Sequence, residues 1–257
     1  MQNKKHLKIV IFTFLFLTST GSIYSQANST DYFLGYGGVA LVASGELFFK
    51  EALTPQNPKW IEPLSFDLFF RDKLKWDNSN LDKAALVSDV ILKGLLGPSV
   101  FWSPLLSDHN YGRHLLLNIQ ALAATAFLTN ISKYAFARQR PYSYFKSIQA
   151  EADDDFLSFF SGHTSFSFAI ATSMSYILEK ENPHNSALIW GSAITLASLT
   201  GYLRIASDRH YMSDVLTGAI IGSMMGYVIA KNQSKRFFKR GGSKQISTTM
   251  VNFTILF

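Results

Sequence analysis

The chain of 257 residues contains no cysteine, which excludes both a disulfide framework and a thiolate metal site. Charged residues are scarce, at 16% of the chain, whereas aromatic residues reach 14%. No repeat of fixed period is present. The length predicts one domain with tails and a sizeable core, and the scarcity of charge indicates helices that are buried or embedded in lipid.

Long uninterrupted apolar runs are also lacking. Most apolar segments are 15 to 18 residues long and contain Ser, Thr, Asn or Gln, a length between that of a buried core helix and that of a membrane span. The segments lie near 33–49, 84–106, 115–131, 164–178, 186–203 and 215–230. In the last of them, small residues recur at helical spacing, which favours close helix packing. These residues are Gly218, Ala219, Gly222, Ser223 and Gly226.

The body of the chain lacks a net positive charge, although the formal net charge of the whole chain is +6. Nine of the 24 basic residues, and no acidic ones, lie in residues 1–26 and 231–257. Residues 27–230 therefore carry 15 bases and 18 acids. This balance argues against a partner nucleic acid and indicates tails that flank a membrane.

Both ends of the chain have a character of their own. Residues 1–25 combine a basic start with an apolar run from Ile9 to Leu17, as a signal peptide or a signal anchor does. Residues 231–257 form a basic tail in which the imperfect alternation after Gln245 predicts a short strand. The stretch 51–83 is rich in Pro, Lys and Asp and predicts an excursion at the membrane surface.

Three short blocks in the second half contain the groups that a phosphate-transferring site needs. They are Lys133 with Arg140-Pro141, Ser161-Gly162-His163, and Arg204 with His210 and Asp214. Taken singly, each cation is more often a solvated or snorkelling charge, so the evidence lies in the order and the spacing. The three cations can neutralise phosphate oxygens, and the histidines can serve as nucleophile and acid.

The spacing predicts local structure. Lys133 and Arg140 are seven residues apart, so a helix that runs into Pro141 and ends there would present both on one face. Ser161 precedes a helical run and can cap it, and Gly162 lets an anion approach the backbone N–H groups at the start of that helix. His210 and Asp214 are four residues apart, which suits a hydrogen bond that fixes the imidazole tautomer.

With these blocks the chain resembles the type 2 phosphatidic acid phosphatase and vanadium haloperoxidase superfamily, in particular its membrane-associated bacterial phosphatase branch. The family pattern is K-x6-R-P, P-S-G-H and S-R-x5-H-x3-D, and the resemblance covers roughly residues 115–230. Phe160 replaces the proline and Leu203 replaces the first serine of the third block. Neither exchange removes a group with an obligatory chemical role, so activity is expected, with effects on rate and substrate preference.

The resemblance implies a mechanism and a set of roles. His210 would attack phosphorus to form a phosphohistidine, oriented by Asp214, while His163 would protonate the leaving oxygen and then activate water. The phosphate would be bound by Lys133, Arg140, Ser161, Gly162 and Arg204. The scheme requires no metal and no cofactor, because the three cations replace the magnesium ions of other phosphoryl-transfer sites; vanadate is a cofactor only under the haloperoxidase reading.

Three functional hypotheses follow. The first is a phosphatase for lipid or lipid-linked phosphates in the bacterial inner membrane. The second is a soluble periplasmic acid phosphatase of broad specificity, released by cleavage of the leader. The third is a vanadate-dependent haloperoxidase, for which the chain is short. The expected partners are a phosphorylated lipid or a small phosphate ester, together with a membrane and without a nucleic acid, and the sequence leaves the oligomeric state open.

The expected fold is an all-α helical bundle with five or six membrane spans and the active site at one end. With Lys231 to Lys244 in the cytoplasm, the three blocks fall on the periplasmic face. The organisation is then a leader at 1–25, an N-terminal helical region with a surface excursion at 26–114, the catalytic core at 115–230 and the basic tail at 231–257. The acidic cluster from Glu151 to Asp155 reads as a solvated loop. Arg138, Asp208 and Arg209 lie inside the spacers of the first and third blocks, where they could contact substrate, but nothing in the sequence selects them for a role.

Overall fold

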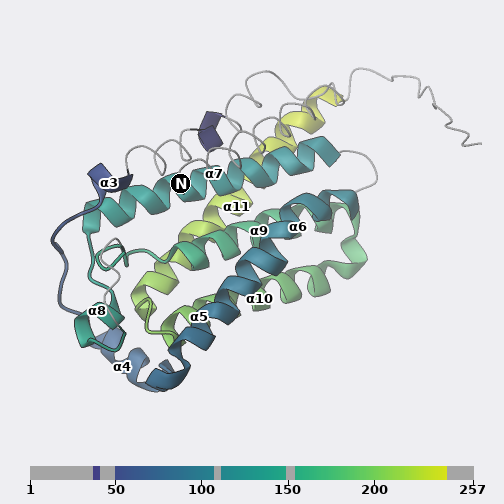
Figure 1. The fold of residues 1–257 in the computed structure, drawn as a ribbon. Helices are drawn as coiled ribbons and strands as arrows, with labels where there is room; N and C mark the ends of the chain where they lie inside the picture. Colours follow the sequence, from purple (N-terminus) through teal and green to yellow (C-terminus); the bar gives the residue numbers. More distant parts are fainter. Residues whose placement is uncertain (1–36, 41–49, 107–110, 149–153, 242–257) are drawn as a thin grey trace, which may run out of the picture.

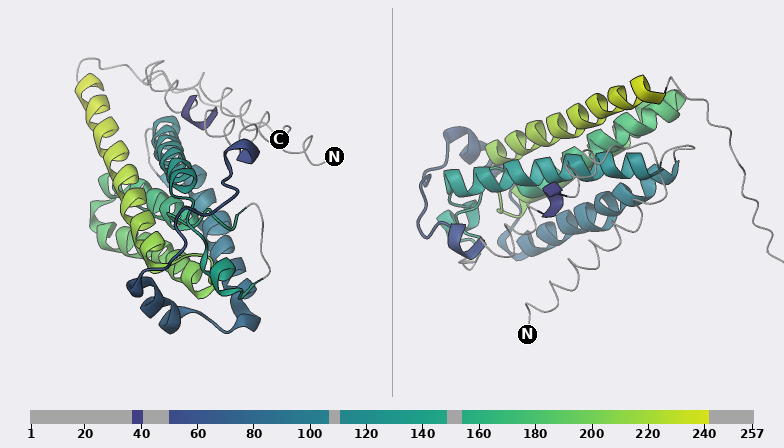
Figure 2. Two further views of the ribbon diagram at one scale, coloured as in Figure 1. Left: turned by 90° about the vertical axis from the view of Figure 1, so that its left-hand side faces the viewer. Right: turned by 90° about the horizontal axis from the view of Figure 1, so that it is seen from above.

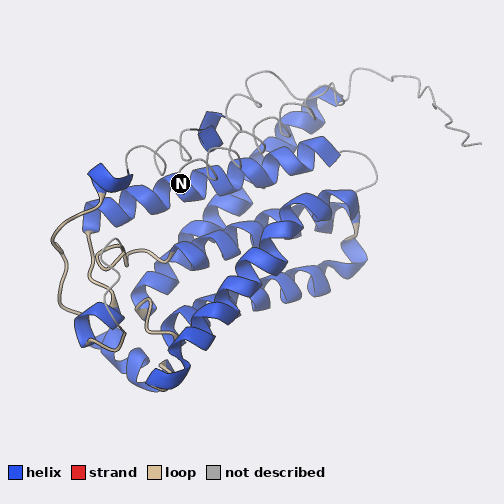
Figure 3. Cartoon of the chain, viewed as in Figure 1, coloured by secondary structure: helices blue, strands red, loops and turns tan. Residues whose placement is uncertain are grey.

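The protein, studied as a computed structural model, is described for residues 37–40, 50–106, 111–148 and 154–241. The leader at 1–25 and the strand expected after Gln245 lie outside these residues. Within them the secondary structure is helical, with an isolated bridge between Trp60 and Arg138 in place of any sheet (Figure 3). The all-α fold expected from the sequence is confirmed.

Long helices run alongside one another and form a bundle (Figures 1 and 2). Two short helices, α4 and α8, lie together at one end of it (Figure 1). A π-helical stretch, Val90–Leu96, joins α5 to α6. The helices are α3 (Lys50–Leu53), α4 (Ser65–Leu74), α5 (Leu81–Asp89), α6 (Gly97–Trp102), α7 (Tyr111–Phe136), α8 (Pro141–Phe145), α9 (Gly162–Glu181), α10 (Ser186–Ala206) and α11 (Met212–Gly241).

Four helical segments are long and apolar enough to cross a membrane. They are Asn78–Leu106, Tyr111–Phe136, Pro183–Ala206 and Met212–Asn232. Large apolar side chains are exposed along them, for example Leu86, Leu188 and Ile220, as expected for helices that face lipid. Of the five or six spans expected, the described residues thus provide four by length and composition, and the protein is a membrane protein.

The expected span at 164–178 lies in α9, which the other helices enclose. Its interior face contains hydroxyl side chains that form hydrogen bonds within the bundle. Ser173 donates to Oδ1 of Asn118 at 2.9 Å, and Thr172 donates to the carbonyl of Phe168 at 2.8 Å. Because these polar groups are satisfied inside the protein, α9 combines burial with low hydropathy.

Glycines of α11 bring that helix into close contact with α9. A Cβ atom on Gly218 would lie 2.7 Å from the carbonyl oxygen of Ser161, and one on Gly222 would lie 2.1 Å from that of Ser165. One on Gly226 would lie 2.1 Å from Oγ1 of Thr172. The small-residue packing expected from the sequence is confirmed, and Gly218 extends it to the backbone that precedes the start of α9.

The prediction that a helix runs into Pro141 is wrong. Helix α7 ends at Phe136, and Ala137 adopts a φ of 41°. Arg140 is extended, with φ −72° and ψ 151°, and Pro141 begins α8. A proline restricts the preceding residue to extended conformations and fits the first turn of a helix. Lys133 therefore stays on α7 while Arg140 lies on the loop beyond it, so the two do not share a helix face.

Candidate active site

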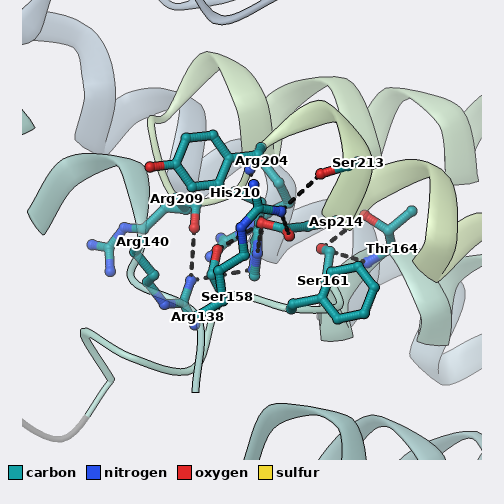
Figure 4. Close-up of polar contacts among 12 residues, drawn as sticks. Arg138, Arg140, Ser158, Ser161, Thr164, Arg204, Arg209, His210, Ser213 and Asp214 are labelled. Atoms are coloured by element: carbon teal, nitrogen blue, oxygen red, sulfur yellow. Dashed lines mark hydrogen bonds and ion pairs between the residues drawn. The ribbon is translucent and has the colours of Figure 1, made fainter. Parts of the chain in front are cut away.

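His210 lies in the loop between α10 and α11 and is 2% exposed. Its backbone N–H donates to the carbonyl of Arg204 at 3.1 Å. Its Nε2 lies 3.2 Å from Nη1 of Arg140, and its Nδ1 lies 3.6 Å from Oδ2 of Asp214 (Figure 4). The imidazole thus stands between a guanidinium and a carboxylate, with Nε2 on the side of the cation.

The hydrogen bond expected between His210 and Asp214 is not formed at this separation. Asp214 instead accepts hydrogen bonds from Nη1 of Arg138 at 2.5 Å, from Oγ of Ser158 at 2.6 Å and from the backbone N–H of Tyr211 at 2.9 Å. Helix α11 begins at Met212, so Asp214 occupies its first turn and its carboxylate binds the backbone there. The carboxylate still faces the ring, at ion-pair distance.

Arg138 is a buried residue that no pattern in the sequence selects. It is 1% exposed, and its two terminal nitrogens bridge Asp214 and Asp67, each at 2.5 Å. Its guanidinium lies 3.8 Å from the ring centroid of Trp60 and 4.2 Å from that of Tyr211. Arg138 therefore connects Asp214 to helix α4, in which Asp67 lies.

Arg140 is bound on several sides. Its Nε donates to the backbone carbonyl of Asp154 at 2.9 Å, and its Nη1 donates to that of Arg209 at 3.0 Å. Its Nη2 forms an ion pair with the carboxylate of Asp154 at 2.7 Å. Burial alone would raise the pKa of Asp154, but the charges of Arg140 and Lys133 hold it well below its usual range. The Asp154 carboxylate is therefore an anion beside the candidate phosphate-binding cations.

The solvated-loop interpretation of the acidic cluster is wrong for its last two members. Asp154 pairs with Arg140, and Asp155 is 7% exposed, with a backbone carbonyl that accepts from the N–H of Arg140 at 2.8 Å. Glu151 and Asp153 lie outside the described residues. The buried guanidinium of Arg140 orders this end of the loop, which composition alone does not reveal.

Ser161 caps α9, as expected. Its Oγ accepts from the N–H of Thr164 at 3.4 Å and from the Thr164 hydroxyl at 2.9 Å, and its own N–H donates to the carbonyl of Asp214 at 3.1 Å. A Cβ atom on Gly162 would lie 3.7 Å from Nζ of Lys133. The ammonium group of α7 thus lies beside the first residue of α9, where free backbone N–H groups attract an anion.

His163 and Arg204 converge on one residue of α5. Nε2 of His163 lies 2.6 Å from Oδ1 of Asp89, and Nη1 of Arg204 lies 3.8 Å from the same oxygen. Arg204 also donates from Nη1 to Oγ of Ser88 at 3.1 Å. No pattern in the sequence connects α5 with the three blocks, because more than 70 residues separate Asp89 from His163.

The two departures from the family pattern are buried. Leu203 is 3% exposed and belongs to a cluster of core side chains with Leu115, Ile119 and Ile170, so it points into the core rather than towards phosphate. Phe160 is 5% exposed, with its ring centroid 6.1 Å from that of Phe159. Both side chains contribute apolar packing beneath the site.

Asp208 stabilises the loop that carries His210. Its carboxylate accepts from Arg71 of α4 at 2.6 and 2.8 Å and from the hydroxyl of Ser147. Its carbonyl accepts from the N–H of Tyr142 at 3.0 Å, and its φ of 58° turns the chain. These contacts give Asp208 a structural role, because they hold the loop that carries His210.

Charge and burial set the protonation of His210. Burial lowers its pKa well below the usual value, and the positive charges of Arg140, Arg204 and Lys133 lower it further. The ring is therefore neutral at physiological pH and has a lone pair available for attack.

The three blocks thus meet at one end of the bundle, from the end of α7, the start of α9, the end of α10 and the start of α11 (Figure 1). In the described part of the chain, no group of three or more His, Asp or Glu side chains is arranged to hold a metal. The geometry suits an anion held by Lys133, Arg140 and Arg204, with a neutral imidazole beside it.

Comparisons with known proteins agree with this geometry. Residues 115–238 match the family model of the PAP2 superfamily. The chain is 33% identical to lipid A 1-phosphatase of Porphyromonas gingivalis over 117 residues, which are 46% of this chain and 23% of that protein. The chain thus spans about a quarter of the length of that curated relative.

A solved structure supports the fold. It is that of a transmembrane PAP2-type phosphatidylglycerolphosphate phosphatase from Bacillus subtilis, which aligns over 80% of this chain and 96% of its own. The TM-score is 0.50 and the sequence identity is 17%, so the likeness concerns the arrangement of the helices.

Proposed function

We propose that this chain is a phosphoric monoester hydrolase that acts on lipid or lipid-linked phosphates, because residues 115–238 match the family model of the PAP2 superfamily. One observation carries the proposal: Nε2 of the buried, neutral His210 lies 3.2 Å from Nη1 of Arg140. A phosphate bound by that guanidinium would have its phosphorus within reach of the imidazole lone pair.

The reaction has two steps. In the first, Nε2 of His210 forms a bond to phosphorus while the bond from phosphorus to the ester oxygen breaks, and His163 gives the departing oxygen a proton. In the second, a water oxygen bonds to phosphorus, His163 takes the proton of that water, and the bond to Nε2 breaks. Asp214 stabilises the positive charge that develops on the ring from the Nδ1 side.

Electrostatic stabilisation comes from three side chains and the helix start. Arg140 and Arg204 are 3% and 5% exposed, so their charges act in a medium of low dielectric constant. Lys133 lies beside Gly162, where the backbone N–H groups of α9 begin. Ser161 contributes by capping α9 and so fixing those N–H groups. With this set of cations the reaction needs neither a metal nor a cofactor.

The substrate class follows from the association of the protein with a membrane. Four helices that are suited to lipid support a site at the membrane, where phosphorylated lipids are presented. The relative that is 33% identical over 117 residues is a lipid A 1-phosphatase, which supports a lipid phosphate as the substrate. A soluble acid phosphatase would have to keep these four apolar helices in water. Nothing in the site favours the haloperoxidase reading over phosphate transfer.

The position in the cell follows from the positive-inside rule. Nine basic residues lie at the two ends of the chain, which puts the tail after Lys231 in the cytoplasm and the start of α11 on the opposite face. We therefore infer an inner-membrane protein with its site open to the periplasm and with residues 1–25 as its leader.

The test is phosphate release from phosphatidate, undecaprenyl diphosphate, lipid A and p-nitrophenyl phosphate by membranes that carry the wild type or His210→Ala, without added metal. Lipid-selective release that is lost in the variant supports the proposal. His184→Ala, at an exposed position outside the site, is the matched control and should keep full activity. Activity that persists in His210→Ala would overturn the assignment of the nucleophile.

A further inference from the structure

Asp89 is the last residue of α5, outside the segment that matches the family model. Its carboxylate nevertheless reaches into the candidate site. Oδ1 lies 2.6 Å from Nε2 of His163 and 3.8 Å from Nη1 of Arg204, while Oδ2 accepts from Nζ of Lys93 at 2.6 Å. A π-helical turn begins at Val90, directly after it, and such turns often occur at functional sites.

The contact with His163 has a chemical consequence. A carboxylate accepts a proton but does not donate one, so Nε2 of His163 must carry hydrogen in this pair. The nitrogen that remains for exchange is then Nδ1. This is the arrangement that a general acid needs, because one ring nitrogen is fixed as a donor and the other gives and takes the catalytic proton.

We propose that Asp89 is a positioning residue for the general acid: it holds Nε2–H of His163, so that Nδ1 serves the leaving oxygen. The inference rests on the proposed function. When the ester bond breaks, the Nδ1 proton moves to the ester oxygen and leaves a neutral ring with hydrogen on Nε2. When water attacks, Nδ1 takes its proton and the charged ring is restored beside the carboxylate.

The charges around His163 explain why a carboxylate matters here. Burial and the charges of Arg204 and Lys93 lower the pKa of the His163 ring, whereas the Asp89 carboxylate raises it. His210 also interacts with this ring electrostatically, and the ammonium of Lys133 lies beside Gly162, the preceding residue. Positive neighbours favour loss of the ring proton. Among the described residues, Asp89 is the acidic side chain that forms an ion pair with His163, so it is the group that opposes this loss.

Asp89 also differs from a residue that only packs. It is 36% exposed, so its replacement leaves no large cavity, and its backbone lies within a continuous helix. Arg204 keeps its hydrogen bond to Ser88 when the Asp89 side chain is removed. A substitution should therefore change proton transfer more than folding or phosphate binding.

The experiment compares Asp89→Ala and Asp89→Asn with the wild type on two substrates, an alkyl phosphate lipid with a poor leaving group and p-nitrophenyl phosphate with a good one. We expect kcat for the lipid to fall by about 10²-fold, the lower end of what a general acid contributes, with KM nearly unchanged. For p-nitrophenyl phosphate the fall should be much smaller. The basic limb of the kcat profile for the lipid should move to lower pH.

Two further variants complete the design. His163→Ala combined with Asp89→Ala should be no slower than His163→Ala alone, because Asp89 acts through His163. Asp82→Asn, an exposed carboxylate on the same helix, is the matched control and should keep full activity. Equal losses on both substrates, a loss confined to KM, or additive effects in the double variant would each overturn the proposal.

A measurement that needs no turnover distinguishes failure of the proposed function from failure of the role proposed for Asp89. The protein is labelled with ¹⁵N-histidine, and the NMR signal of His163 is assigned by its absence in His163→Ala. In the wild type the spectrum should show a hydrogen on Nε2 of His163. In Asp89→Ala this hydrogen should lose its protection from exchange with water. A wild type without phosphatase activity would refute the proposed function alone. A His163 ring that is unchanged by Asp89→Ala would refute the role of Asp89.

Discussion

Arg138 donates to Asp214 from Nη1 at 2.5 Å, and the same guanidinium donates to Asp67 from Nη2 at 2.5 Å. Both carboxylates are fully buried. The carboxylate that faces His210 is thus held by a charged side chain whose second partner lies on α4. The position of the carboxylate beside the proposed nucleophile depends in this way on a helix outside the three blocks.

The first prediction concerns Asp67. Removing one partner of a buried ion pair leaves an uncompensated charge and typically costs 3–5 kcal/mol. Asp67 also accepts from the N–H and the hydroxyl of Ser213, so we expect Asp67→Ala to lower the free energy of unfolding by about 3 kcal/mol or more. Thermal unfolding in detergent measures this. Asp72→Ala, at an exposed position on the same helix, should change stability by less than about 0.5 kcal/mol, and a similar small change for Asp67→Ala would contradict the network.

The second prediction tests the contact between α9 and α11. A methyl group at Gly222 would lie 2.1 Å from the carbonyl oxygen of Ser165, so Gly222→Ala should separate the helices and destabilise the protein. Gly191 on α10 has no atom within 4 Å of the corresponding position. Gly191→Ala should therefore stabilise by about 0.5–1 kcal/mol, as replacement of an unhindered helical glycine does. Melting temperatures of the two variants should shift in opposite directions; shifts of the same sign would argue against the close approach.

The third prediction concerns pH. The attacking form of His210 is neutral, and burial together with Arg140 lowers its pKa well below the usual value. Activity that depends on this ring should persist as pH falls below about 6.5, the usual pKa of histidine, and should be lost only at the lower pKa of the folded protein. The pH profile of kcat/KM, corrected for ionisation of the substrate, measures the acidic limb at which this activity is lost. An acidic limb with its midpoint at or above pH 7 would contradict the lowered pKa of the buried His210 ring beside Arg140.

The same shift has a consequence for stability. Between the lowered pKa of the folded state and about 6.5 in the unfolded chain, the unfolded state binds more protons at His210. The free energy of unfolding should therefore decrease as pH falls through this window.

The fourth prediction concerns Asp154, whose carboxylate pairs with Arg140 at 2.7 Å. A phosphate must compete with this carboxylate for the guanidinium, so Asp154→Asn should bind inorganic phosphate more tightly as an inhibitor. The backbone carbonyl of Asp154 still accepts from Nε of Arg140, which keeps the guanidinium in place. The inhibition constant for phosphate is the measurement, with Asp77→Asn as an exposed control. Weaker inhibition in Asp154→Asn would mean that the carboxylate helps to organise the site rather than to occupy it.

Much of the site could be predicted because its blocks are local. Ser161 caps α9 and His163 follows in its first turn, as the Ser-Gly-His string indicates, and Gly222 and Gly226 pack against α9 as their spacing indicates. These features depend on residues three or four apart. The helical fold follows in the same way from apolar segments of helical length.

The remaining features depend on pairing between distant segments. Asp89, Arg138 and Asp67 reach the site from three separate elements, and their partners lie more than 70 positions away in the sequence. A lone charge in an apolar segment does not reveal which distant charge it will meet. The prediction that a helix ends at Pro141 is wrong for a different reason. A proline can either end or begin a helix, and here it begins α8.

The central claim is that His210 carries the phosphoryl group. Wild-type protein in membranes should be mixed with a ³²P-labelled lipid phosphate, quenched within milliseconds and tested for protein-bound label that is stable in base and released by acid. We predict such a label in the wild type and in His184→Ala, and none in His210→Ala. Label that persists in His210→Ala, at another residue, would contradict the account.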